Sequence, residues 1–114
     1  MSSLIDFESC FRKSVSLISK HGEEYAQAKA QSWYLQEMRK VILADLSKNA
    51  EGKSMAEKEN TARASQEYKT HLEGTKEAIY NELKSRAMLD KANCSFESLR
   101  SLASQQTASM RLGG

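Results

Sequence analysis

The sequence predicts an all-α protein, on three observations. Its 114 residues include no proline and only five glycines, and they are rich in residues that favour helices. Apolar side chains recur every three or four positions along most of the chain, which is the period of one helix face. The stretch 54–92 alone predicts a helix of about 58 Å, whereas a compact domain of this size has a radius of gyration of only about 13 Å. We therefore expect one domain over residues 1–114, built as a long antiparallel helical hairpin that completes its core by oligomerising.

An N-terminal helix, packed on the hairpin, is predicted within residues 1–22. Ser3 is its expected N-cap, and acidic side chains follow in the first turn. Gly22 suits the left-handed position that ends a helix, so we expect a break at His21–Gly22, with a kinked continuation as the alternative. The expected inward stripe consists of Leu4, Phe7, Phe11, Val15 and Ile18.

The hairpin is predicted over residues 23–92. Its first helix, 23–48, has an inward stripe of Tyr25, Ala28, Ser32, Leu35, Met38, Ile42 and Leu46. A turn over 49–53 follows, and Ser54 with Glu57 has the spacing of a capping box. The second helix is expected to run from Ser54 to Ala92, with Gly74 marking a close helix crossing. Its inward stripe is predicted to be Ala62, Ser65, Tyr68, Leu72, Ile79, Leu83 and Leu89.

Residues 93–114 are predicted to form a C-terminal assembly helix and tail. Asn93–Ser95 is a weak interruption at which we expect a break or bend, and Ser95 can cap a helix over 96–110. Continuation of the long helix through these residues is the alternative. The apolar face of this helix is expected to mediate oligomerisation. Its residues are Phe96, Leu99, Leu102 or Ala103, Gln106 and Met110.

The charge and cysteine content exclude several classes of protein. A formal net charge of +2 is too small for a histone-like polycation, so nucleic-acid binding requires local clustering of cations or their repetition around an oligomer. Cys10 and Cys94 lie far apart without metal-ligand spacing, which predicts free thiols in a reducing cytosol. No signal peptide or membrane span is expected. These observations predict a cytoplasmic protein that does not enter a membrane.

Enzymatic motifs are not recognisable in the sequence. His21 and His71 lack neighbours in a metal-ligand pattern, and no glycine-rich phosphate loop occurs. Carboxylates near lysines at helical spacing are typical of a solvated helix face. We therefore expect a protein that is not an enzyme and has no cofactor and no metal site.

The candidate binding residues are cations around the predicted turn. Arg39, Lys40 and Lys48 lie on the helix before it, and Lys53 and Lys58 flank it. Cations for phosphates together with an aromatic ring for base stacking, such as Trp33, are what binding of single-stranded nucleic acid requires. An ordinary amphipathic helix, with Trp33 and Tyr34 in the core or in a subunit interface, explains the same residues.

The order of features around the hairpin carries a family resemblance. It consists of Tyr25–Lys29, Tyr34–Leu35, Arg39–Lys40 and Leu43–Ala44 before the turn, and of Ser54, Glu59, Ala62, Tyr68, His71–Gly74, Ala78, Glu82, Arg100–Ser101 and Ala108 after it. Over roughly residues 24–111 the chain resembles small all-helical proteins of tailed phages. In its layout it is similar to UvsY-type recombination mediators.

The resemblance implies a DNA recombination function. It implies a ring-forming mediator, in the host cytoplasm, that binds single-stranded DNA and helps a RecA-type recombinase to displace single-strand-binding protein. The DNA contacts would fall on Arg39, Lys40, Lys48, Lys53 and Lys58, and the assembly face on Phe96, Leu99, Leu102 and Met110.

A protein-interaction module is the alternative expectation. Such a module would dock on a phage or host enzyme and modulate it. The nearly neutral net charge and the broad apolar surface around Trp33 favour this interpretation.

Overall fold

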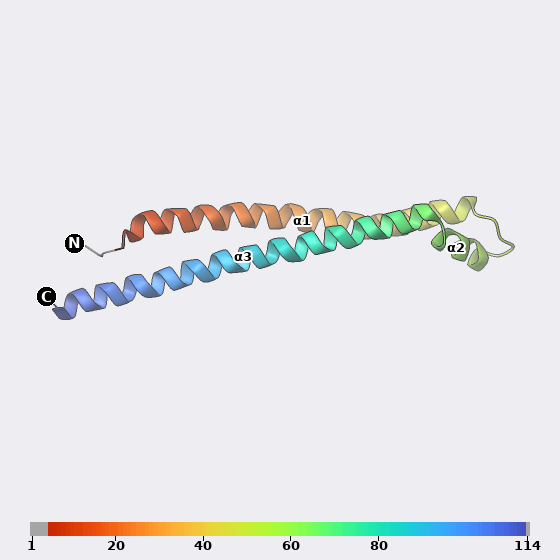
Figure 1. The fold of residues 1–114 in the computed structure, drawn as a ribbon. Coiled ribbons are helices and arrows are strands. Elements are labelled where there is room, and N and C mark those ends of the chain that lie inside the picture. Colours follow the sequence, from red (N-terminus) through yellow and green to blue (C-terminus); the bar gives the residue numbers. More distant parts are fainter. Residues whose placement is uncertain (1–4, 114) are drawn as a thin grey trace. The chain divides into compact units, whose positions relative to one another are not determined.

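The structure, a computed structural model, describes residues 5–113, which form three α-helices (Figure 1). They are α1 (Phe7–Asn49), α2 (Met55–Arg63) and α3 (Gln66–Gly113). No strand occurs within the described residues, so the prediction of an all-α protein is confirmed. No helix among residues 5–113 combines the length and the apolar character that crossing a bilayer requires.

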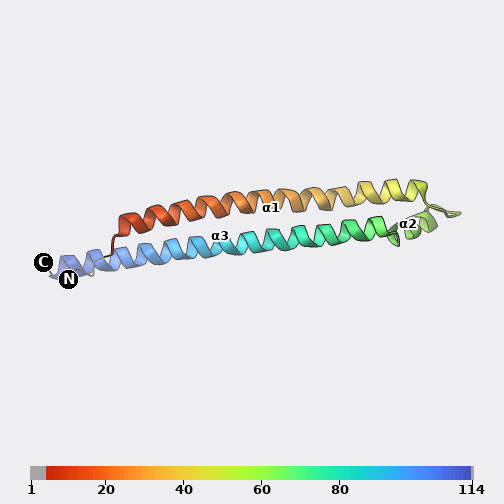
Figure 2. The ribbon, with the colours of Figure 1, turned by 45° about the horizontal axis from the view of Figure 1, so that its top comes forward.

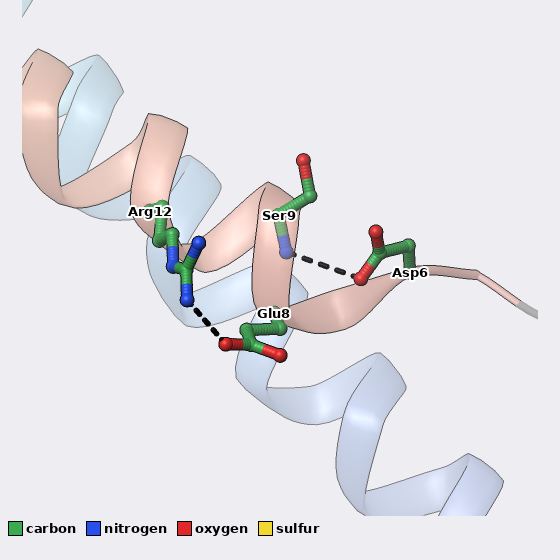
Figure 3. Close-up of polar contacts among 4 residues, drawn as sticks. All are labelled: Asp6, Glu8, Ser9 and Arg12. Carbon is green, nitrogen blue, oxygen red and sulfur yellow. Dashed lines mark hydrogen bonds and ion pairs between the residues drawn. The ribbon is translucent and has the colours of Figure 1, made fainter.

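Helix α1 begins at a cap formed by Asp6 (Figure 3). The Asp6 Oδ1 atom accepts a hydrogen bond from the Ser9 backbone N–H at 3.2 Å, which satisfies one of the free donors at the helix start. Glu8 lies in the first turn and forms an ion pair with Arg12. The predicted cap, Ser3, and the predicted stripe residue Leu4 lie outside the described residues.

The predicted break at His21–Gly22 is wrong, because α1 continues through it to Asn49. Gly22 has no positive φ, and a glycine in a helix interior costs only about 1 kcal/mol relative to alanine. A Cβ built on Gly22 would lie 3.9 Å from Leu89 Cδ1, so the position is covered by α3. Packing and the good helix formers on both sides outweigh this cost, so the segments 1–22 and 23–48 belong to one helix.

The predicted cap at the start of α2 is confirmed for Ser54, while Glu57 reaches back one residue further than in a standard capping box, to Lys53. Ser54 Oγ accepts the Glu57 N–H at 3.2 Å, and the Glu57 carboxylate accepts the Lys53 backbone N–H at 2.7 Å. Thr61 Oγ1 donates to the Glu51 carbonyl at 3.2 Å. These bonds hold α2 against the turn that precedes it.

The predicted single helix 54–92 is wrong, because Ser65 separates α2 from α3. Its hydroxyl donates to the Ala62 carbonyl and accepts the Tyr68 N–H at 3.2 Å. The Ser65 hydroxyl therefore satisfies both the end of α2 and the start of α3. Serine competes with the helix backbone in this way, and so it favours caps over helix interiors.

The expected break or bend at Asn93–Ser95 is also wrong, and the alternative, continuation of the long helix, is what the structure has. Helix α3 runs through Asn93–Ser95 without interruption and ends at Gly113. Asn, Cys and Ser are only slightly less favourable in a helix than alanine. These three residues do not end α3, because Ala92 before them is buried and Phe96 after them packs against Phe11.

The described residues fall into two compact units. Unit 1 contains residues 5–25 and 85–113, and unit 2 contains residues 26–84. Each unit therefore combines a segment of α1 with a segment of α3, and unit 2 also contains α2.

Unit 1 is held together by aromatic and apolar contacts. The rings of Phe11 and Phe96 meet edge to face with centroids 5.5 Å apart, and Gly22 faces Leu89. Within unit 1, later residues of α1 therefore contact earlier residues of α3, which is an antiparallel arrangement of the two segments. The predicted stripe holds for Phe7, Phe11 and Ile18 but not for Val15, which is exposed. The α3 residues that are at least partly buried here are Ser85, Leu89, Ala92, Phe96, Leu99, Ala103 and Gln106.

In unit 2, α1 and α3 lie side by side (Figure 2). Several of the most deeply buried residues between them are small, namely Ser32, Thr75 and Ala78. The predicted stripe of α1 is confirmed, since Ala28, Ser32, Leu35, Met38, Ile42 and Leu46 are all at least partly buried. Ser32 is 0% exposed, and its Oγ accepts Gln36 Nε2 at 2.9 Å. On α3 the inward residues are Tyr68, His71, Thr75, Ala78 and Glu82.

The predicted stripe on α3 is wrong for Leu72, Ile79 and Leu83, which are all exposed. This exposed row follows His71, Ala78 and Glu82 of the inward row by one residue each. Successive side chains of a helix point in different directions around its axis. When the row of His71, Ala78 and Glu82 faces α1, the row of Leu72, Ile79 and Leu83 is therefore left exposed. Gly74 does not mark a close crossing either, because a Cβ built on it meets nothing within 4 Å.

Candidate nucleic-acid interface

A groove in unit 2 lies between α1 and α2 and has a volume of about 450 Å³. Three of the five predicted DNA-binding residues, Lys40, Lys48 and Lys58, line it. We call it the α1–α2 groove. Its remaining lining residues are Leu43, Ala44, Ser47, Met55 and Glu59.

Helical spacing explains why these residues meet. The lining residues of α1 lie at 40, 43, 44, 47 and 48, and those of α2 at 55, 58 and 59. Side chains three and four positions apart share one helix face. One face of each helix therefore forms one wall of the α1–α2 groove.

The charge of the groove is predominantly positive. None of Lys40, Lys48 and Lys58 forms an ion pair within the part of the chain that the structure describes. The single carboxylate, Glu59, is partly balanced by Arg63, whose Nη2 lies 3.8 Å from Glu59 Oε2. An anion in the groove would therefore meet three cations and one partly neutralised carboxylate.

Ser47 is a lining residue that the sequence did not single out. It is 4% exposed, and its Oγ atom is buried without a hydrogen-bond partner within the described residues. Buried hydroxyls normally find a partner, and an exception calls for an explanation. No sequence signal distinguishes Ser47 from the many other serines of the chain.

The other two predicted DNA-binding residues do not line the α1–α2 groove. Arg39 lines a second, smaller groove of about 270 Å³ between α1 and α3, together with Gln36, Leu72, Thr75, Lys76 and Ile79. Lys53 is exposed in the turn. The structure therefore brings Lys40, Lys48 and Lys58 to one groove, which Arg39 and Lys53 do not line.

Trp33 is 64% exposed, so it is not a core residue of unit 2. It precedes Lys40 by seven residues, which is two helical turns, and it therefore lies on the same face of α1. Tyr34 beside it is also exposed. An aromatic ring is thus available to a ligand or a partner on the helix face that carries Lys40.

The predicted assembly face in unit 1 is only partly available for assembly. Phe96 packs against Phe11 of the same chain, and Leu99 is partly buried. Leu102 and Met110 are 47% and 61% exposed. Arg100 forms an ion pair with Glu97 at 3.2 Å.

The histidines make contacts of other kinds. His21 Nδ1 lies 3.3 Å from Glu24 Oε2, and His71 Nε2 lies 2.9 Å from the Leu35 carbonyl oxygen. Within residues 5–113 no group of three or more His, Cys, Asp or Glu side chains is placed to hold a metal ion.

Comparison of the chain with protein-family models, with curated proteins and with solved structures gave no match. The class of protein is therefore inferred from the chain's own residues and contacts.

Proposed function

We propose that this chain is a non-enzymatic accessory factor in DNA recombination or replication that binds single-stranded DNA along the α1–α2 groove. The observation that carries the proposal is the convergence of Lys40, Lys48 and Lys58 on one groove without intrachain ion pairs among the described residues. Lysines that bind phosphates supply affinity without reading the base sequence. Trp33, exposed on the same face of α1, supplies a surface for base stacking.

The proposal includes assembly of several copies. Each chain contributes few cations, and repetition around a ring of long helical hairpins multiplies weak contacts into useful avidity. In the cytoplasm of the producing or infected cell, such a ring would help a RecA-type recombinase to displace single-strand-binding protein. The resemblance to UvsY-type mediators supports this role.

Binding of a fluorescein-labelled oligo(dT) at low salt, followed by fluorescence anisotropy, tests the proposal. The triple variant Lys40→Glu, Lys48→Glu, Lys58→Glu is expected to lose binding. The matched control is Lys13→Glu, Lys20→Glu, Lys91→Glu, which makes the same change in net charge at exposed positions of unit 1. Equal losses in the two variants would show that binding follows net charge and not the groove.

A protein-interaction module, docking on and modulating a phage or host enzyme, is the second candidate function. The exposed apolar side chains of unit 2 favour it, because Trp33, Tyr34, Leu72, Ile79 and Leu83 are each at least 36% exposed and are available for a partner to cover. Trp33→Ala should then abolish binding to a recombinase or single-strand-binding protein while DNA binding persists. The reverse pattern, with DNA binding lost and protein binding kept, would contradict this candidate.

A further inference from the structure

We propose that the smaller groove of unit 2, between α1 and α3, binds an amphipathic helix of a partner protein whose apolar side chains are flanked by carboxylates. We call it the α1–α3 groove. The proposal goes beyond DNA binding, because it assigns a second site and a partner of another class, and it does not depend on the α1–α2 groove. The lining residues are Gln36, Arg39, Leu72, Thr75, Lys76 and Ile79.

The apolar part of the α1–α3 groove has the spacing of a helix-binding surface. Leu72 and Ile79 are 39% and 36% exposed, and they lie seven residues apart on one face of α3, about 10.5 Å along its axis. Leu83, 58% exposed, extends the same row by one turn. An amphipathic helix in a groove presents anchors at i, i+3, i+4 and i+7. The row on α3 therefore offers matching contacts over about three turns.

The size and lining of the α1–α3 groove favour peptide side chains over a nucleotide. Its volume of about 270 Å³ is below the range of about 300–1,000 Å³ that is typical of small-ligand sites. None of its lining residues is aromatic, so it provides no ring for base stacking. A shallow depression with aliphatic walls suits the single side chains of a helix that packs into it.

The polar lining residues determine the charge of the partner. Gln36 Nε2 donates to Ser32 Oγ at 2.9 Å, and Thr75 Oγ1 donates to the carbonyl one turn before it at 2.9 Å. Arg39 and Lys76 are exposed and form no ion pair within residues 5–113. No carboxylate lines the groove. A complementary partner therefore supplies carboxylates beside its apolar side chains.

A second copy of the chain does not complement the α1–α3 groove by two-fold pairing. Such a pairing places the same surface patch of both copies in contact. It would bring Arg39 and Lys76 of one copy near the same two cations of the other, and like charges repel. The charge of the groove therefore favours an acidic partner of a different sequence.

Fluorescence anisotropy of a labelled peptide tests the proposal on the full chain. The probe is a helical peptide of about four turns, with Leu along one face and Glu on both sides of that face. One matched peptide carries Lys in place of Glu, and another has the residues of the probe in scrambled order. The probe should bind at least tenfold more tightly than either. Equal binding of a matched peptide, or no binding of the probe, would overturn the proposal.

Substitution of the apolar row locates the bound peptide. Leu72→Ser, Ile79→Ser should weaken binding of the probe about tenfold, and its helical circular dichroism should persist because both side chains are exposed. The control is Tyr34→Ser, Val41→Ser, which changes two exposed apolar residues of α1 outside the groove. Equal losses in the two variants would show that the probe binds elsewhere.

Substitution of the cations tests the charge of the partner. Arg39→Gln, Lys76→Gln should weaken binding of the probe about tenfold, while Lys84→Gln, Arg86→Gln, with the same change in net charge at exposed positions of α3, should not. Arg39→Glu, Lys76→Glu should reverse the preference, so that the peptide with Lys binds more tightly than the probe. An unreversed preference would show that these cations do not select the partner.

The outcomes separate the proposal from DNA binding and from self-association. Lys40→Gln, Lys48→Gln, Lys58→Gln should lose oligo(dT) and keep the probe; if the probe binds and oligo(dT) does not bind the unsubstituted chain, the proposal stands and the proposed function fails. If oligo(dT) displaces the probe and requires Leu72 and Ile79, the groove is a DNA site and the proposal is wrong. It is also wrong if Leu72→Ser, Ile79→Ser abolishes self-association in sedimentation velocity, because another copy then occupies the groove.

Discussion

The Nε2 atom of His71 lies 2.9 Å from the backbone carbonyl oxygen of Leu35, across the α1–α3 seam of unit 2. A carbonyl oxygen only accepts, so Nε2 carries the hydrogen and donates it. A side chain of α3 thus reaches the backbone of α1 directly. The buried residues one turn away on each helix are small, since Ser32 precedes Leu35 by three positions and Thr75 follows His71 by four.

Replacing His71 should therefore destabilise unit 2. His71→Ala removes a donor to α1 and leaves space in the seam, and we expect the free energy of unfolding to fall by about 2 kcal/mol. Chemical denaturation at a fixed protein concentration measures the change. His71→Gln keeps an amide donor, so it should lose less; an unaltered denaturation midpoint in His71→Ala would contradict the assigned contact.

Gly74→Ala should stabilise the protein. Gly74 lies in the interior of α3, and a Cβ built on it meets nothing within 4 Å, so the gain in helix propensity of about 1 kcal/mol is not offset by a clash. Thermal unfolding checks this. Gly52→Ala provides the contrast, because its Cβ would lie 2.9 Å from both Glu57 Cβ and Lys58 N, and it should lower Tm.

Ser65→Ala should destabilise the junction of α2 and α3 by about 1 kcal/mol. The change removes the hydroxyl that bonds the Ala62 carbonyl and the Tyr68 N–H. Denaturant unfolding measures the loss, with Ser101→Ala on an exposed position of α3 as the control. A more stable Ser65→Ala variant would mean that a continuous helix is preferred and that the cap is unimportant.

Leu102 and Met110 test the proposed self-association. Both are exposed in unit 1, so the double variant Leu102→Ser, Met110→Ser should keep its helical circular dichroism while its association weakens at least tenfold. Sedimentation velocity over a range of concentrations gives the answer, and Gln105→Ser is the polar control. Unchanged sedimentation of the double variant would exclude these two residues from any assembly contact.

Helix content and most of the α1 seam were predictable from the sequence, whereas only part of the α3 seam was. Tyr68, Leu89 and Phe96 are at least partly buried, as predicted. On α1 the predicted stripe contained Ala28, Ser32 and Leu35 together with larger residues, and packing follows it. On α3 the prediction followed the largest apolar residues, Leu72, Ile79 and Leu83, although the seam accepts the smaller row. Hydrophobicity alone does not predict close packing through Ser, Thr and Ala.

Helix ends were predictable where side-chain chemistry at the cap was distinctive. Ser54 with Glu57 has a paired signal, and both side chains accept backbone N–H groups at the start of α2, Ser54 from Glu57 and Glu57 from Lys53. Ser65 has no such pair, so its cap was missed, whereas Gly22 was given too much weight as a helix end. One glycine costs about 1 kcal/mol, which the packing of a long helix exceeds.

For the candidate site, the sequence predicted the cations but not their grouping. Lys40 and Lys48 share a face of α1, but Lys58 joins them only because α2 turns back after the loop, and Arg39 faces a different groove. Ser47 was missed because its significance depends on burial and on an unpartnered Oγ. Neither property is visible in a serine-rich sequence.

The salt dependence of DNA binding tests the central claim most directly. For single strands, log Kobs falls with log[salt] with a slope of about −0.7 for each phosphate neutralised. If Lys40, Lys48 and Lys58 each neutralise one phosphate, substituting all three by Gln should make the slope shallower by about 2. The matched variant Lys13→Gln, Lys20→Gln, Lys91→Gln should keep the slope of the unsubstituted protein. Equal slopes for all three proteins, or no binding of oligo(dT) at low salt, would contradict the account.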